Sequence, residues 1–96
     1  MDLHDQADNV HDPGSFLEFV RSLVADRADE VPKESVNPSA PYGPGANGWE
    51  NGTIEAFLDA ALRWAEDSAF GTKQELPEHN PWRQFATFLL CGKIYE

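Results

Sequence analysis

The sequence predicts an all-α protein, a small three-helix domain, and three observations lead to this prediction. Three segments repeat apolar residues with the period of a helix. Each of them starts at residues typical of helix N-termini. The longest stretch between them is rich in proline and glycine and lacks the alternation of a strand. We therefore expect helices over about residues 15–29, 52–67 and 81–95, within a single domain over residues 15–96.

Residues 1–14 precede the first predicted helix and are polar, acidic and without periodicity. Such a segment buries too little apolar surface to fold, so we expect a disordered arm. His4 and His11 lie among aspartates there, but their spacing matches no closed zinc set and no calcium loop. We expect no metal site in this arm.

The first helix is predicted to start at Ser15, because Ser15 and Glu18 have the spacing of a capping box. The apolar residues that follow share one face and end near Asp29, before Pro32. They are Phe16, Phe19, Val20, Leu23 and Val24. Residues 30–50 hold several prolines and glycines, and a loop of this length is usually either functional or disordered.

The second helix has the most regular pattern in the chain, with either Asn51 or Thr53 as its N-cap. Its apolar residues fit one face of an amphipathic helix: Ile54, Phe57, Leu58, Ala61, Leu62 and Ala65. This stripe predicts a buried face, with the charged residues on the opposite side.

The third helix is predicted to begin at Asn80 and Pro81, a capping residue followed by proline in the first helical position. It is apolar on two faces, of which the first holds Trp82, Phe85, Ala86, Leu89 and Leu90 and the second holds Phe88, Cys91 and Tyr95. A helix with two apolar faces fits a position between the other two helices. We therefore expect the first and third helices to run parallel and the second to be reversed. The default is a monomer, and a dimer through the second face is the alternative.

Acidic residues far outnumber basic ones, since 17 acids and 7 bases give a net charge of −10. This balance disfavours nucleic acid and anionic membranes and favours a basic protein partner, although it also serves solubility. No apolar run is long enough to span a bilayer, and the first residues lack the regions of a signal peptide. A cytoplasmic location is therefore expected.

Motifs that carry chemistry are missing: there is no phosphate-binding glycine loop, no G-x-S-x-G and no H-E-x-x-H. Cys91 lies on an apolar face, where a thiol normally acts as a small hydrophobe. We expect a protein that is not an enzyme, without catalytic residues and without a cofactor.

A polar pole is the candidate interaction site. In the predicted arrangement, Arg27 and Lys93 reach the same end of the domain as the start of the second helix. Negative charge at the end of the third helix opposes its dipole and calls for nearby cations. The alternative is that both cations extend past the core to solvent. The candidate residues are Trp49, Glu50, Asn51, Arg27, Lys93, Tyr95 and Glu96.

Several short motifs together resemble a known family. They are Trp49-Glu50-Asn51 before the second helix, Pro81-Trp82 at the start of the third, and Lys93-Ile94-Tyr95-Glu96. Over roughly residues 15–96 the chain resembles a family of small bacterial proteins classed only as domain of unknown function 7660. The acidic arm and the Pro-rich segment before Trp49 depart from the family pattern. The resemblance implies no activity, cofactor or catalytic residue.

Size, acidity and the missing motifs lead to one functional expectation. The chain is predicted to be a non-enzymatic bacterial protein-protein interaction module of immunity or antitoxin type, which covers a basic target. The alternatives are a structural homo-oligomer and an accessory protein that binds a small ligand at the polar pole.

Overall fold

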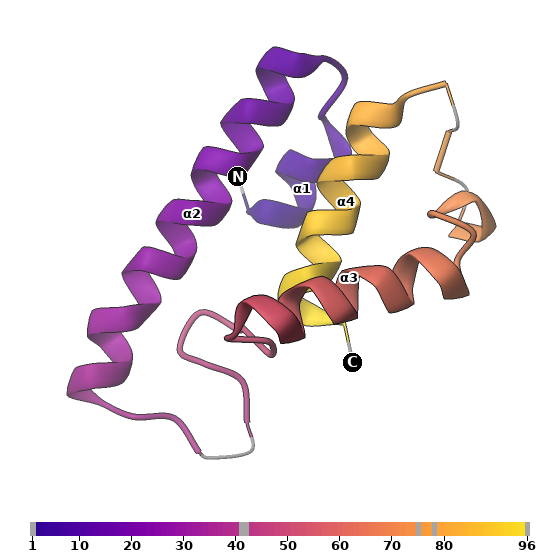
Figure 1. The fold of residues 1–96 in the computed structure, drawn as a ribbon. Coiled ribbons are helices and arrows are strands. Elements are labelled where there is room, and N and C mark those ends of the chain that lie inside the picture. Colours follow the sequence, from indigo (N-terminus) through magenta and orange to yellow (C-terminus); the bar gives the residue numbers. More distant parts are fainter. Residues whose placement is uncertain (1, 41–42, 75, 78, 96) are drawn as a thin grey trace.

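The computed structural model describes residues 2–40, 43–74, 76–77 and 79–95. These residues form α1 (Leu3–Asp8), α2 (Pro13–Val36), α3 (Ile54–Asp67), the short 3-10 helix η1 (Thr72–Gln74) and α4 (Pro81–Ile94) (Figure 1). No strand occurs among them, so the all-α prediction is confirmed. The helix count differs from the prediction, since α1 was not expected. No helix in these ranges is long and apolar enough to cross a bilayer.

The central helix is α4, as its two apolar faces predicted, because α1, α2 and α3 all pack against it. In Figure 1, α2 and α4 run in the same direction, also as expected, whereas α3 runs across α4 instead of antiparallel to it. A close contact explains the crossing: Gly92 has no side chain and lets the ring of Phe57 lie directly on the α4 backbone. Within the described residues, α2 and α3 do not pack on each other.

The prediction of an unstructured arm over residues 1–14 is wrong for its described part. Asp2 caps α1 by accepting a hydrogen bond from the Asp5 N–H at 2.8 Å. Ala7 and Val10 are each 1% exposed in the core. The amide of Asn80 also donates to the Val10 carbonyl at 2.9 Å. Burial against α2 and α4 therefore provides the stabilisation that a helix as short as α1 lacks in isolation.

The predicted bounds of the first helix, 15–29, are too short at both ends. Asp12, not Ser15, is the N-cap of α2: its carboxylate accepts from the Ser15 N–H at 2.7 Å, and the Ser15 hydroxyl accepts from the Asp12 N–H at 3.2 Å. The helix also continues through Pro32. A proline inside a helix removes one backbone donor, here the partner of the Ala28 carbonyl. Contacts of the following turn with the loop compensate for this loss.

The long loop is ordered around two carboxylates of α2 over its described residues. Glu34 accepts from the Ser39 N–H at 2.8 Å, the Ser39 hydroxyl at 2.5 Å and the Ala46 N–H at 2.6 Å. Glu30 is fully buried and accepts from Arg27 at 3.0 Å and from the Asn47 N–H at 3.3 Å. A Cβ on Gly45 would overlap the Glu30 carboxylate, so the loop lies directly on this side chain.

Substituting Glu34 with glutamine is expected to flatten the acid dependence of stability. Hydrogen bonds from Ser39 and Ala46 hold the pKa of Glu34 below its ordinary value of 4.5. A lowered folded pKa contributes stability that is complete above the unfolded value and is lost as pH falls through the folded value. Urea unfolding followed by tryptophan fluorescence, from about pH 7 to about pH 3, should show a smaller decline for Glu34→Gln than for the parent.

Glu66→Gln, at an exposed position of α3, is the matched control for this experiment and should keep the parent slope. If Glu34→Gln and the parent lost stability in parallel, the three hydrogen bonds to Glu34 would not be contributing in solution.

The other predicted helix starts agree with the structure. Thr53 caps α3 by accepting from the Ala56 N–H at 3.1 Å. Asn80 caps α4 by accepting from the Arg83 N–H at 3.2 Å, and Pro81 occupies the first position of this helix. The core cluster that surrounds α4 consists of Ala7, Val10, Phe19, Leu23, Trp49, Ala86 and Leu90.

Candidate functional site

The end of α4 is capped by the segment that precedes α3. The Glu50 N–H donates to the Lys93 carbonyl at 2.9 Å. The Asn51 amide donates to the carbonyls of Gly92 and Tyr95, both at 3.0 Å. Carbonyls in the last turn of a helix have no partner within that helix and need one from elsewhere. Asn51 therefore caps α4 from outside, while Thr53 takes the N-cap position of α3.

Asp26 joins three elements through one oxygen. Its Oδ2 accepts from Trp49 Nε1 at 2.8 Å and from Lys93 Nζ at 2.7 Å. Lys93 is only 8% exposed, and its ammonium lies 5.6 Å from the centre of the Trp49 ring. A buried ammonium needs a charged partner and hydrogen bonds to offset its lost hydration. Asp26 supplies both, so Lys93 does not extend to solvent.

Arg27 lies beside the same tryptophan. Its guanidinium is 5.6 Å from the Trp49 ring centre and donates to Glu30 at 3.0 Å and to the Gly52 carbonyl at 3.2 Å. The Trp49 ring stacks on Phe57 with 6.0 Å between centres. Cation–ring contacts and aromatic stacking of this kind stabilise the position of Trp49 beyond what the burial of its apolar surface contributes.

Tyr95 ties the end of α4 to the end of α3. Its hydroxyl donates to the Asp67 carboxylate at 2.6 Å. This hydrogen bond, together with burial and the negative charge of Asp67, raises the pKa of Tyr95. Phe88, on the same side of α4, stacks on Phe70 with 5.7 Å between ring centres. The second apolar face of α4 is therefore partly covered by the same chain at these positions, where Phe88 and Tyr95 are half-buried.

The structure thus brings together six of the seven residues predicted at the polar pole: Arg27, Trp49, Glu50, Asn51, Lys93 and Tyr95. Glu96 lies outside the described residues. The sequence analysis missed Asp26 and Glu30, the acids that organise the cluster. Their spacing of four, continued by Glu34, places all three on one side of α2 and was the available signal.

An apolar groove opens next to this cluster, between α2 and α3. Its volume is about 620 Å³. It is lined by Val20, Leu23, Val24, Arg27, Ala28, Trp49, Asn51, Gly52, Thr53, Ile54, Phe57, Leu58 and Leu89. Several of the apolar side chains at its edges are open to water: Val24 is 63% exposed, Ile54 76% and Leu58 53%.

The apolar stripe of α3 is consequently not a single buried face, as was predicted. Ala60, Ala61 and Trp64 are buried, whereas Ile54, Leu58 and Leu62 form a row that is more than half exposed. The stripe is wider than the surface that α4 covers, and no described part of α2 packs against the remainder. Large exposed apolar surfaces in small proteins commonly mark interaction sites.

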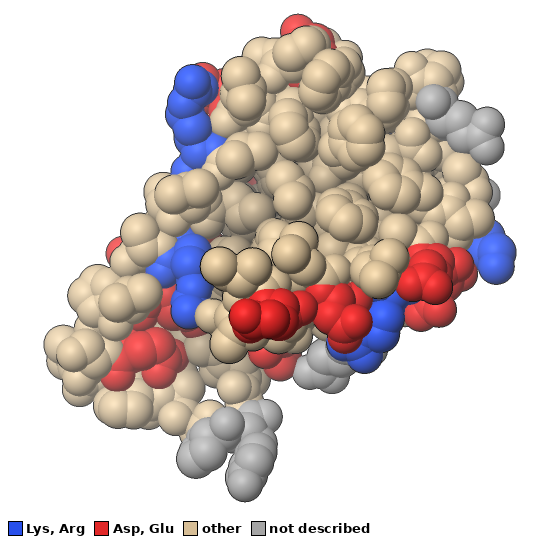
Figure 2. Space-filling view, in the orientation of Figure 1, with Lys and Arg blue, Asp and Glu red and all other residues tan. Residues whose placement is uncertain are grey.

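Acidic side chains border this apolar face. Glu55, Asp59, Glu66 and Asp67 of α3 are all exposed. Figure 2 shows a red band along α3, with tan side chains directly above it. Arg63 interrupts the band and pairs with Asp59 at 3.3 Å. A surface with an apolar centre and an acidic edge is complementary to a partner with the opposite charge.

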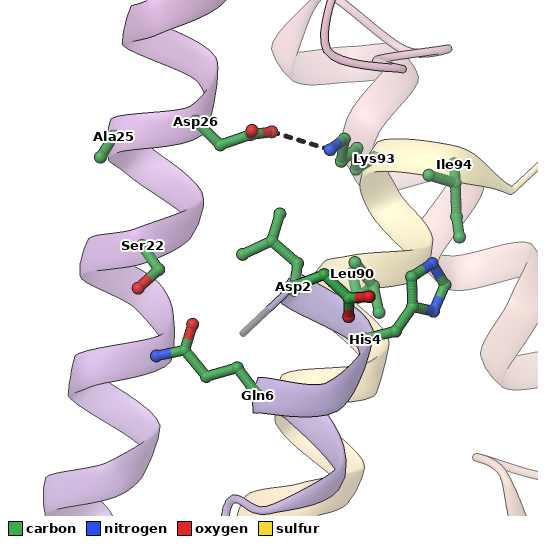
Figure 3. Close-up of a pocket in the computed structure, with 10 residues that line it drawn as sticks. Asp2, His4, Gln6, Ser22, Ala25, Asp26, Leu90, Lys93 and Ile94 are labelled. Atoms are coloured by element: carbon green, nitrogen blue, oxygen red, sulfur yellow. Dashed lines mark hydrogen bonds and ion pairs between the residues drawn. The ribbon is translucent and has the colours of Figure 1, made fainter.

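A second hollow of about 580 Å³, with both polar and apolar lining residues, lies between α1, α2 and α4 (Figure 3). The pair of Asp26 and Lys93 closes one end, and Gln6 and Ser22 line the side toward α1 and α2. The charges of Asp26 and Lys93 balance each other, and Asp26 also holds Trp49. Asp26 and Lys93 are therefore engaged in contacts that hold the fold together.

The described part of the chain holds no cluster of three or more His, Cys, Asp or Glu side chains that suits a metal ion. Burial raises the pKa of the Cys91 thiol to about 11. At neutral pH this thiol is protonated and a poor nucleophile.

Comparison with known proteins gives one match. The model of a family of unknown function, DUF7660, matches residues 13–96. No curated protein and no solved structure matches the chain. The matched range contains the acids of α2, the segment that caps α4 and both walls of the apolar groove. It begins at the first residue of α2, so α1 lies outside it.

Proposed function

We propose that this chain, which belongs to the DUF7660 family of unknown function, works by binding another protein of basic character and not by catalysis. The observation that carries the proposal is the groove between α2 and α3, whose apolar edges are open to water next to exposed acids. Burying apolar surface favours association, and the acids select for a basic partner.

The charge of the whole chain supports the same partner chemistry. A net charge of −10 on 96 residues attracts basic proteins over a distance of about a Debye length and speeds their encounter. It repels nucleic acid and anionic membranes, so neither is proposed as a partner.

A small acidic protein that covers a basic target suits an immunity or antitoxin role in the bacterial cytoplasm, and we propose this as the specific function. The target would be a basic toxin or a similar enzyme whose active surface is blocked on binding. Size and charge support this role, together with the uncovered apolar surface of α3.

The homo-oligomer alternative loses its main support. It required Phe88, Cys91 and Tyr95 to lie open on α4, but Phe88 stacks on Phe70 and Tyr95 bonds to Asp67. Self-association through the apolar groove would bring two chains of net charge −10 together. Like charges across an interface oppose association.

Purification of the tagged chain from its source cells tests the proposal. We expect a basic protein to be recovered at about 0.05 M salt and largely lost at about 0.5 M, because exposed charges are screened at high salt. Glu55→Lys, beside the groove, should reduce recovery severalfold. Glu18→Lys, an equally drastic change at an exposed position of α2, should have little effect.

Recovery of an acidic or neutral partner, or of a basic partner that resists salt and Glu55→Lys, would contradict the proposal. Both variants should first be shown to unfold at the same urea concentration as the parent, so that lost recovery reports on the surface and not on folding.

A further inference from the structure

We infer that the groove between α2 and α3 receives an amphipathic helix of the partner, with its apolar side chains in the groove and its lysines or arginines over the acids of α3. This inference rests on the proposed function and adds the docking site and the form of the occupant. It draws on the shape of the groove, the chemistry of its walls and the charge around it.

The shape of the groove is that of an unfilled helix position. Both α2 and α3 pack on α4, and within the described residues they do not pack on each other. Ile54 and Leu58, which line the groove, are four residues apart along α3, and the exposed Leu62 continues this spacing beyond the lining. Rows of this spacing are the ridges between which side chains of a facing helix insert.

The chemistry of the walls favours a helix over an extended segment. Apolar side chains supply most of the lining, including Val20, Val24 and Leu58. An extended peptide would bring unpaired N–H and C=O groups against these walls, which costs free energy for each group. A helix pairs its own backbone groups and presents only side chains, as in other helix-in-groove complexes.

Contacts within the chain hold Trp49 at the floor of the groove. Leu23 and Phe57 line it together with Trp49, which is fixed by its hydrogen bond to Asp26 at 2.8 Å and by stacking on Phe57 at 6.0 Å. A preformed floor lowers the ordering cost of binding, so that more of the buried apolar area contributes to affinity.

Charge identifies the polar face of the occupant. The exposed acids Glu55 and Asp59 directly follow Ile54 and Leu58, which line the groove. Arg27, the charged residue of the lining, is engaged with Glu30 and the Gly52 carbonyl. A helix with basic side chains beside its apolar face meets opposite charge here. A second copy of this chain would meet its own acids, which argues against it as the occupant.

A defined peptide tests the inference. The probe is a synthetic helix of about 18 leucines and lysines with leucine on one face, long enough to be helical in water. In nuclear magnetic resonance titrations of the full chain, we expect shifts concentrated on Val24, Ile54, Leu58 and Phe57. A peptide with glutamate in place of every lysine should cause no such shifts.

Two matched variants localise the binding. Val24 lines the groove and is 63% exposed, whereas Val31 is on the same helix, is 57% exposed and does not line it. Val24→Lys should weaken binding of the leucine–lysine peptide about tenfold, which corresponds to about 1.4 kcal/mol. Val31→Lys, with the same change of charge, should weaken it less than about twofold.

The outcomes separate the docking site from the proposed function. Shifts spread over all acidic surfaces, with equal effects of Val24→Lys and Val31→Lys, would contradict the groove as the docking site. The proposal of a basic partner would survive that result. Absence of binding by the leucine–lysine peptide at low salt would overturn the inferred occupant. If a salt-sensitive basic partner were still recovered from cells, the proposed function would survive that result.

Discussion

Replacing Asp26 with alanine is expected to lower the free energy of unfolding by about 3 kcal/mol. Asp26 is the charged partner of Lys93, whose ammonium is 2.7 Å away and whose side chain is only 10% exposed. The change strands this cation and also removes the acceptor of Trp49 Nε1 at 2.8 Å. Losing one partner of a buried pair is costly because the other charge stays buried without compensation. Urea unfolding followed by tryptophan fluorescence measures the loss.

Two comparisons make the Asp26 experiment specific. Adding Lys93→Met to Asp26→Ala removes the stranded charge and should recover part of the lost stability. Asp59→Ala breaks the pair with Arg63, where both side chains are at least half exposed, and should cost well under about 1 kcal/mol. If Asp26→Ala cost no more than Asp59→Ala, the hydrogen bonds of Asp26 would not hold the three elements together.

Replacing Gly92 with alanine is expected to destabilise the protein by about 2 kcal/mol, although the same change inside an exposed helix usually stabilises it. A Cβ at this position would lie 2.7 Å from Phe57 Cε2 and 2.9 Å from two further ring atoms. Neither side can yield easily, because Gly92 is buried in the last turn of α4 and Phe57 also stacks on Trp49. Thermal unfolding should show the decrease as a lower melting temperature.

Gly14→Ala is the control for the Gly92 prediction. Gly14 is in the first turn of α2, and the nearest atom to its added Cβ would be an Asp12 carboxylate oxygen at 3.7 Å, an ordinary contact. This variant should be as stable as the parent or more stable. The combination of Gly92→Ala with Phe57→Leu should be less destabilised than the sum of the single changes, since the smaller side chain relieves the overlap. Strict additivity would exclude Phe57 as the cause.

Sequence reasoning succeeded where local chemistry or one strong pattern decides the structure. Asn80 and Pro81 start α4 because capping and the proline at the first position act within a single turn. The central place of α4 followed from its two apolar faces. The predicted order, with the second helix reversed, led to the expectation that Arg27, Lys93 and Trp49 meet. Both cations lie 5.6 Å from the Trp49 ring centre, although α3 crosses α4 instead of running antiparallel to it.

Sequence reasoning failed where tertiary contacts override a local rule. The segment that forms α1 is too short to show a period, and burial of Ala7 and Val10 is what fixes it. Pro32 did not end α2, because the loop that returns to Glu30 and Glu34 holds the helix beyond it. The spacing of apolar residues in the sequence also cannot show how much of an apolar stripe the neighbouring helices will cover.

The groove could not be predicted from the sequence for this last reason. Ile54, Leu58 and Leu62 obey the helical period as well as the buried Ala61 does, yet they remain more than half exposed. Periodicity gives the side of a helix on which apolar residues lie. Whether a neighbour reaches that side depends on the crossing of α3 over α4, which is a property of the assembled fold.

The central position of α4 also determines when the protein can fold during synthesis. The ribosome makes α1, α2 and α3 before the helix on which all of them pack. Until α4 emerges, core side chains such as Phe19 and Leu23 lack the α4 part of their cluster, Ala86 and Leu90, and the nascent chain displays them to water. Chains in this state are those that chaperones bind and that aggregate most readily. We expect tertiary structure to form only after α4 has emerged, with little protection from proteases before then.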